Sequence, residues 1–190
     1  MADRLTKGFN LEQTVLFIDQ AFSASERDRI YARLPEQLKG RLGGLRTADW
    51  YPIDDQVAFL EAMVAVVSGP EEGERRTRAL GRFISDAATG TFMRLVLKVL
   101  TPNIFLRKAG SIWPRMFSFG IFESDPSGFG DKRAVMILRD VGGFAHVAGV
   151  SAGWIEGVFG AMGFNDVRVR YGLLPDVEPG SGWRFDIDWT

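Results

Sequence analysis

The chain has 190 residues, of which 46% are hydrophobic and 12% aromatic, a composition that suits one globular domain with a substantial core. Its net charge of −1 argues against a basic nucleic-acid-binding surface, and the lack of cysteine excludes disulfides, thiolate nucleophiles and cysteine-ligated metal sites. No apolar run approaches the roughly 20 residues that span a bilayer, and residues 1–13 lack the apolar segment of a signal peptide, so a cytoplasmic protein is expected.

The first part of the chain is predicted to be helical. Residues 9–43 contain three short apolar patterns at helical spacing. Asn10 with Gln13 resembles a capping pair for the first helix, and Ser23 with Glu26 forms a capping box for the second. Pro35 suits the first turn of the third.

Two longer helical patterns follow. Trp50 and Tyr51 precede a proline and are therefore expected to be extended, after which a helix runs to about residue 67. A further apolar pattern covers residues 71–99, and Gly90 in its middle predicts a kink or a joint between two helices. Thr101 begins another short helix.

Strand patterns dominate the last third of the chain. Phe117, Phe119 and Ile121 alternate and predict a strand, and residues 134–141 read as its antiparallel partner after a turn. Residues 151–162 then show helical spacing, with Ser151 as a candidate N-cap.

Two further strands are predicted at the end, over residues 167–171 and 183–189, because apolar and charged residues alternate there. Antiparallel pairing would place Arg168 and Arg170 opposite Asp188 and Asp186, which favours that register. The segment between these strands, rich in Pro and Gly, predicts a loop.

Because helices come first and strands last, an α+β fold is expected. We predict a single domain over residues 1–190, in which a mainly helical half, 9–110, packs on strands and one helix, 111–190. The C-terminal half would form an antiparallel sheet of about four strands with helix 151–162 inserted.

Catalytic signals are weak. His146, the only histidine, could be a haem ligand or a general base, but no partner motif accompanies it, so a loop histidine without a special role is favoured. Glu156 lies at the edge of an apolar helical stripe; it could point into a pocket, but an exposed side chain or a local backbone hydrogen bond is favoured. Nucleotide-binding glycine motifs and a nucleophile elbow are absent, so the chain is not expected to be an enzyme, although activity is not excluded.

Aromatic residues around the junction of the two halves could line an apolar ligand pocket, although ordinary core packing explains any single one equally well. The candidates are Trp113, Phe117, Phe119, Trp154, Phe159, Tyr171 and Trp183.

Three stretches, in this order and spacing, resemble a known group of bacterial domains. They are WYPIDDQVAFLEA, then LGRFISDAATGTFMRLVLKVLTPNIFLRKAGSIWPRMFSFGIFE, then GWIEGVFGAMGFNDVRVR with SGWRFDIDW. The group contains the 4-vinyl-reductase-type and haem–nitric-oxide-binding-like domains, and the chain is most similar to uncharacterised paralogous domains of myxobacteria. The resemblance covers about residues 8–190 and implies an apolar cavity between a helical half and an antiparallel sheet, in domains that sense small molecules or bind partners.

Two departures from the group bear on cofactors. The 4-vinyl-reductase-type domains often have cysteines in the last hairpin, where this chain has Leu173, Leu174 and Trp183, so no metal site is expected. Haem-binding relatives use a histidine on a mid-chain helix and a Tyr-x-Ser-x-Arg motif, and this chain has neither. No cofactor is therefore expected, and haem is disfavoured.

Two functions remain as hypotheses. The first is a non-catalytic cytoplasmic sensory domain that binds a small apolar molecule. The second is a protein-interaction module, a homodimer without a ligand. It is suggested by apolar helical surfaces around residues 57–67 and 80–99, and by the distant similarity of the group to vesicle-tethering subunits that dimerise. A haem-based sensor or an enzyme is less favoured.

Overall fold

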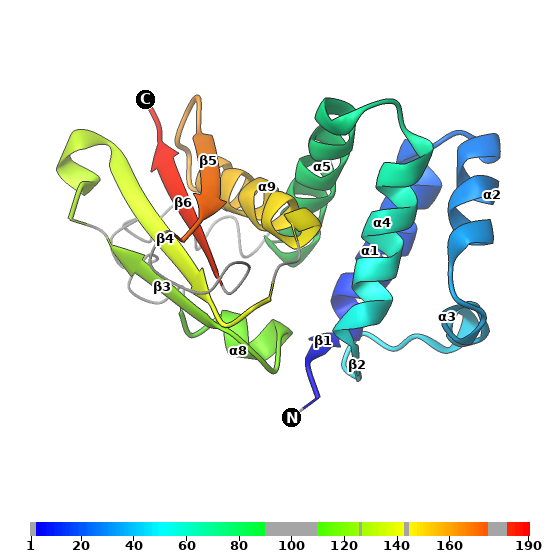
Figure 1. The fold of residues 1–190 in the computed structure, drawn as a ribbon. Helices are drawn as coiled ribbons and strands as arrows, with labels where there is room; N and C mark the ends of the chain where they lie inside the picture. The colour runs from blue at the N-terminus through cyan, green and yellow to red at the C-terminus, as the bar shows by residue number, and fades with distance from the viewer. Residues whose placement is uncertain (1–2, 90–109, 126, 143–144, 175–181) are drawn as a thin grey trace.

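The computed structural model describes residues 3–89, 110–125, 127–142, 145–174 and 182–190. Its N-terminal half is helical (Figure 1), with α1 (Gly8–Ala21), α2 (Ala24–Arg33), α3 (Glu36–Arg41), α4 (Ile53–Val66) and α5 (Pro70–Thr89). Two short strands, β1 (Leu5–Lys7) and β2 (Trp50–Pro52), pair antiparallel beside these helices. The expected joint at Gly90 and the helix from Thr101 lie outside the described residues.

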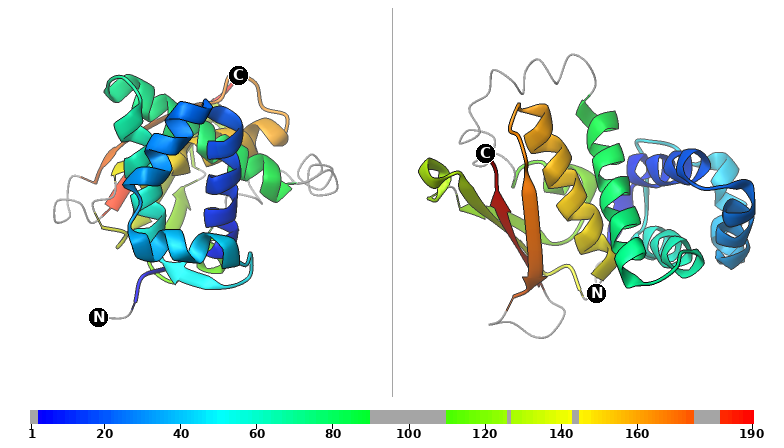
Figure 2. Two further views of the ribbon diagram at one scale, coloured as in Figure 1. Left: turned by 90° about the vertical axis from the view of Figure 1, so that its right-hand side faces the viewer. Right: turned by 90° about the horizontal axis from the view of Figure 1, so that it is seen from above.

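The C-terminal half contains an antiparallel sheet in the order β3-β4-β6-β5. Its strands are β3 (Ile121–Asp125), β4 (Arg133–Arg139), β5 (Arg168–Leu173) and β6 (Gly182–Asp188), accompanied by the helices α8 (Trp113–Met116) and α9 (Ala145–Ala161). The expected α+β class is therefore confirmed. Seen from above, the elements follow one another as sheet, α9, α5 and then the remaining helices (Figure 2).

The predicted register of the last two strands is confirmed. Arg168 pairs with Asp188 and Arg170 with Asp186, so the basic face of one strand meets the acidic face of the other. The side chains of Arg170 and Asp188 also form a diagonal ion pair at 2.7 Å. The opposite face of β6, which carries Phe185, packs into the core.

Two hydrophobic core clusters lie on either side of α5 and α9. The sheet cluster includes Met136, Phe159 and Phe185, all fully buried, and the helical cluster includes Phe59 and Leu60. Trp154 packs against both clusters. It therefore connects the two halves of the described fold.

The contact between α5 and α9 depends on glycines. A Cβ at Gly153 would overlap the carbonyl oxygen of Arg78, and a Cβ at Gly81 would overlap that of Val150. Gly149 and Gly157 likewise face α5 without room for a methyl group. Small residues four apart on one helix face let two helix backbones approach closely.

Three local predictions are wrong. The helix predicted from Ser151 begins at Ala145, because residues 147–150 are buried against neighbouring elements and extend it toward the N-terminus. The strand predicted over 117–121 begins only at Ile121, since Gly120 has a φ of 77° and interrupts the extended repeat. Asn10 does not cap α1 but lies inside it.

The capping box of Ser23 and Glu26 is confirmed at the start of α2, and Trp50 and Tyr51 are extended as predicted. None of the helices in the described residues has the length and apolar character needed to span a membrane.

Candidate functional site

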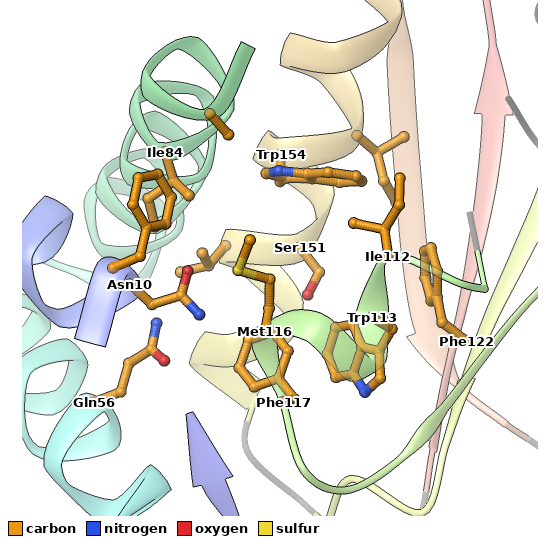
Figure 3. Close-up of a pocket in the computed structure, with 14 residues that line it drawn as sticks. Asn10, Gln56, Ile84, Ile112, Trp113, Met116, Phe117, Phe122, Ser151 and Trp154 are labelled. Carbon is orange, nitrogen blue, oxygen red and sulfur yellow. The ribbon is translucent and has the colours of Figure 1, made fainter. Parts of the chain in front are cut away.

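A cavity of about 110 Å³ lies where the helical half meets α8 and α9. Aliphatic and aromatic side chains make up most of its wall, shown in Figure 3. The lining residues are Phe9, Asn10, Gln56, Ile84, Ala88, Ile112, Trp113, Met116, Phe117, Phe122, Val150, Ser151, Trp154 and Ile155. Because they come from α1, α4, α5, α8, β3 and α9, the cavity exists only in the folded chain.

An aromatic stack forms the wall on the sheet side. The ring of Trp113 lies 4.1 Å from that of Phe117 and 5.7 Å from that of Phe122, nearly parallel to both. Trp113 is held in place by its indole N–H, which donates to the carbonyl oxygen of Phe119 at 2.6 Å. Pro114 in the first turn suits the short helix that carries Trp113.

Helix α9 supplies a second wall. Val150, Ser151, Trp154 and Ile155 recur at helical spacing and so share one face. In Figure 3, the hydroxyl of Ser151 lies on the cavity side of the helix, near Met116 and Trp113. This face is distinct from the glycine face that packs against α5.

A buried polar group forms one end of the cavity. The Thr6 hydroxyl donates to Gln56 Oε1 at 3.0 Å and accepts from Asn10 Nδ2 at 3.0 Å. The Thr14 hydroxyl donates to the carbonyl oxygen of Asn10 at 2.7 Å. Asn10 and Gln56, which line the cavity, are 4% and 3% exposed, so their amides are held inside the fold and not in solvent.

Three of the predicted pocket residues, Trp113, Phe117 and Trp154, are brought together in this lining. Phe119 is adjacent, with its ring 5.9 Å from that of Phe117, but it does not line the cavity.

The other three candidates lie in the sheet cluster instead. Phe159 is on the sheet side of α9, with its ring 5.5 Å from that of Trp189. Tyr171 and Trp183 form a cross-strand pair at 5.8 Å between β5 and β6. Their elements are expected to face the helical half, but α9 lies between the sheet and most of that half (Figure 2). Tyr171 still reaches α5, where the Arg78 guanidinium lies over its ring, but it does not line the cavity.

The two polar candidates also lie outside the cavity. His146 is in the first turn of α9 and is partly exposed. Glu156 accepts from Arg78 at 2.5 Å and from Arg82 at 2.6 Å, while Arg78 also donates to the carbonyl oxygen of Val169. The sequence favours an exposed Glu156 or one bonded to local backbone, and this prediction is wrong. Glu156 instead joins α9 to α5. In the described part of the chain, no group of three His, Cys, Asp or Glu side chains could hold a metal ion.

Sequence reasoning missed the polar end of the cavity. The sequence pattern predicts Asn10 to be a helix cap and does not single out Gln56. The signal that could have found them is a polar residue within an apolar helical stripe, because buried polar side chains are more informative than buried apolar ones.

Solved structures provide a fold comparison. The chain is similar to an H-NOX protein from K. algicida in its unliganded Fe(II) state, with a TM-score of 0.69 and 14% identity over 97% of this chain and 96% of that one. It is also similar to a variant of the T. tengcongensis H-NOX protein (TM-score 0.64, 10% identity, 97% of both chains). An H-NOX protein from S. oneidensis in its Fe(II)NO ligation state gives a TM-score of 0.62 at 9% identity, over 97% of this chain and 99% of that one.

No protein-family model and no curated protein sequence matches the chain. The structural matches extend over nearly the full length of both partners, so the chain shares the fold of these H-NOX proteins.

Proposed function

We propose that the chain is a non-catalytic sensory domain that binds a small apolar molecule in the cavity between its helical half and α8 and α9. The observation that carries this is a preformed cavity of about 110 Å³ with a mostly apolar wall. An engineered apolar cavity of roughly 150 Å³ is known to bind benzene. A molecule with a single small ring is therefore of the size that we expect this cavity to bind. A bound molecule would touch both halves and stabilise their contact.

The H-NOX neighbours raise the question of haem, because their names describe Fe(II) and NO-ligated states. Haem iron is bound in proteins by His, Cys, Met or Tyr side chains. This sequence has no cysteine, and its only histidine, His146, does not line the cavity; neither do its three tyrosines, Tyr31, Tyr51 and Tyr171. Met116 is the one lining side chain of that set among the described residues.

The segments outside the described residues contain no histidine, cysteine or tyrosine in their sequence. The described lining also has no Lys or Arg to pair with the haem carboxylates. Methionine binds haem iron together with a histidine, and no histidine lines the cavity. The described lining therefore does not fit a haem, and we propose a ligand that needs no axial bond.

A cytoplasmic location, a role in signalling and a relation to the uncharacterised myxobacterial domains belong to the same proposal. The first is supported by the cysteine-free composition and the last by the ordered sequence motifs.

Toluene is a suitable first probe. With toluene at ten times its Kd, mass action adds about 1.4 kcal/mol to the free energy of unfolding, which raises Tm by roughly 3–6 °C. Ala88 lines the cavity but is exposed, so Ala88→Phe can obstruct the space without repacking the core. We expect this variant to lose the rise in Tm.

Ala87→Phe is the matched control, because Ala87 is an exposed neighbour on the same helix and does not line the cavity. This variant should keep the response to toluene. Equal responses in both variants, or none in the unmodified protein, would count against the proposed pocket.

The homodimer remains an alternative proposal, but one of the apolar surfaces that suggested it is buried within the fold. The apolar stripe of residues 57–67 packs inside the helical cluster, where Phe59, Leu60 and Met63 are fully buried. Large exposed hydrophobic residues among those described include Leu16 on α1 and Ile121 and Leu173 on the outer strands, which do not share one element. Light scattering over a concentration series would detect a dimer.

A further inference from the structure

The polar end of the cavity has hydrogen-bonding capacity that the protein does not use. Thr6 occupies Oε1 of Gln56 and Nδ2 of Asn10. Among the described residues, no hydrogen bond to another protein atom uses Gln56 Nε2 or Asn10 Oδ1. One N–H donor group and one carbonyl acceptor are therefore left without a protein partner on two side chains that line the cavity.

Both amides are positioned by the fold. Asn10 lies in the first turns of α1, Gln56 in the first turn of α4, and the Thr6 hydroxyl on β1 bridges them. In Figure 3 the two amides lie together at one end of the group of lining side chains, opposite the aromatic stack. Exchanging O and N in either amide would still leave one unused polar atom on each residue.

Neither unused atom belongs to the fully buried, unpartnered side-chain atoms of the described residues. Asn10 and Gln56 are buried as residues but line the cavity, so a hydrogen-bond partner for these atoms can bind in that space. If positions 10 and 56 only filled space in the core, leucine or methionine would pack there without leaving polar atoms unused. A ligand atom in the cavity could satisfy both groups at once.

The charge of that ligand is also restricted. No Lys, Arg, Asp or Glu lines the cavity among the described residues. An ionised head group would lie there without a counter-charge, which costs far more than burying a neutral one.

We infer that the cavity recognises a small apolar molecule with one neutral head group that both donates and accepts hydrogen bonds, such as a hydroxyl or a primary amide, through Gln56 Nε2 and Asn10 Oδ1. The apolar part would lie between the Trp113 stack and α9, with the head group against α1 and α4. This holds only if the cavity takes a ligand, as proposed above.

Phenol and toluene form the test pair, since they differ in one hydroxyl in place of one methyl. Calorimetric titration of the full chain should show phenol binding at least as tightly as toluene, although phenol is the better hydrated of the two. Benzoate at neutral pH should not bind. Phenol should also shift the side-chain amide NMR signals of Asn10 and Gln56 more than toluene does.

Gln56→Met keeps the length of the side chain but removes the Nε2 donor, together with the Oε1 that accepts from Thr6. It should reduce the preference for phenol over toluene roughly tenfold, the value of one hydrogen bond to a buried group, while toluene still binds. Thr14→Val is the control, because it also removes a buried polar group from this network, a hydroxyl in this case, at a residue that does not line the cavity. This variant should keep the preference of the unmodified protein for phenol.

The outcomes separate the two proposals. If neither probe binds the unmodified protein, the proposed function fails and this inference fails with it. If toluene binds the unmodified protein more tightly than phenol does, the proposed pocket is supported but the inferred polar recognition is wrong. This comparison can be made without any substitution. A preference unchanged by Gln56→Met also overturns the inference.

Discussion

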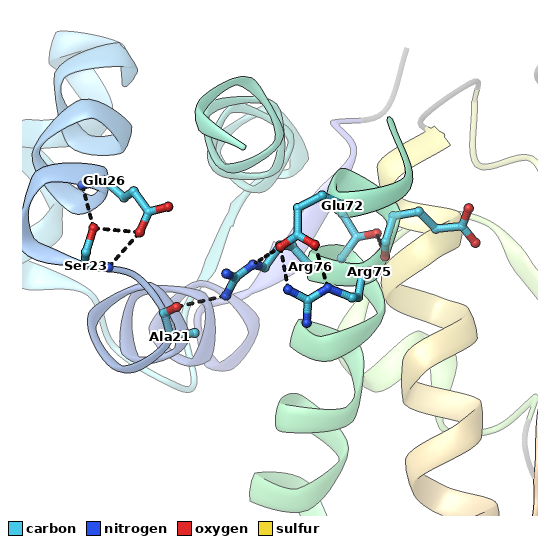
Figure 4. A network of polar contacts seen from close by, with 8 residues as sticks. Ala21, Ser23, Glu26, Glu72, Arg75 and Arg76 are labelled. Carbon is cyan, nitrogen blue, oxygen red and sulfur yellow. Dashed lines mark hydrogen bonds and ion pairs between the residues drawn. The ribbon is translucent and has the colours of Figure 1, made fainter. Parts of the chain in front are cut away.

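At the scale of single residues, Glu72 organises the start of α5 (Figure 4). It accepts from Arg75 at 2.6 Å and from Arg76 at 2.8 Å. Arg76 in turn donates to the carbonyl oxygen of Ala21 at 2.9 Å and lies over the ring of Phe22. Glu72 therefore orients the side chain that ties α5 to the end of α1.

These contacts predict a pH dependence. Hydrogen bonds from Arg75 and Arg76 lower the pKa of Glu72 from 4.5 to about 2. Because the folded-state pKa is the lower one, the stabilisation is present above pH 4.5 and is lost as the pH falls toward 2. Glu72→Gln should therefore be less stable than the unmodified protein near neutral pH, and urea unfolding at a series of pH values should show that difference shrinking in this window.

Glu61→Gln provides the matched control. Glu61 is exposed on α4 and has no ion pair among the described residues. Its substitution should leave the urea midpoint nearly unchanged at every pH. A Glu72→Gln deficit that persisted undiminished at pH 2 would contradict the linkage.

At the scale of elements, the contact between α5 and α9 holds the two halves in place. The glycines of α9 allow the approach, and Glu156 adds ion pairs to Arg78 and Arg82 across the same contact. The side chain of Glu156 is only 13% exposed, so removal of both arginines would leave a largely buried carboxylate.

Two glycines of α9 test this packing. Gly153→Ala would push a methyl group into the Arg78 carbonyl, a backbone atom that cannot move aside cheaply, so we expect a loss of about 1–3 kcal/mol. Gly160 on the same helix has open space, and Gly160→Ala should stabilise the protein by about 0.5–1 kcal/mol through helix propensity. Chemical denaturation of both variants gives the comparison. A stabilising Gly153→Ala together with a destabilising Gly160→Ala would refute the packing argument.

At the scale of the whole molecule, the two core clusters share Trp154. The cavity lies at the same junction, lined by residues of both halves. Binding of a ligand there would therefore depend on how the two halves pack, and would in turn affect that packing. This is the physical basis on which a binding event could become a signal.

The shared junction predicts that the halves unfold together, as the proposed single domain requires. Four of the five tryptophans, Trp113, Trp154, Trp183 and Trp189, pack with the sheet cluster, whereas far-UV circular dichroism mainly follows the helices. We expect the two signals to change at the same urea concentration. Separate midpoints would show that the halves are independent units.

Much of the local structure could be predicted from the sequence. The capping box at Ser23, the extended Trp50 and Tyr51, and the pairing of Arg168 with Asp188 all depend on neighbours in sequence or on strict alternation. The helices-then-strands order was sufficient for the fold class. Such features follow from periods of 3.6 and 2 and from capping chemistry, which act within a few residues.

The tertiary structure alone decided where α9 begins, where β3 begins and which aromatic residues border the cavity. Phe159, Tyr171 and Trp183 are as aromatic as Trp113, but they pack in or against the sheet cluster and do not line the cavity. Asn10 resembles a cap because its residue type suits one, whereas its side chain donates to Thr6 on β1, which in turn donates to Gln56 on α4. A cavity is the space left between elements distant in sequence, so its shape and its polar end depend on packing that no local pattern contains.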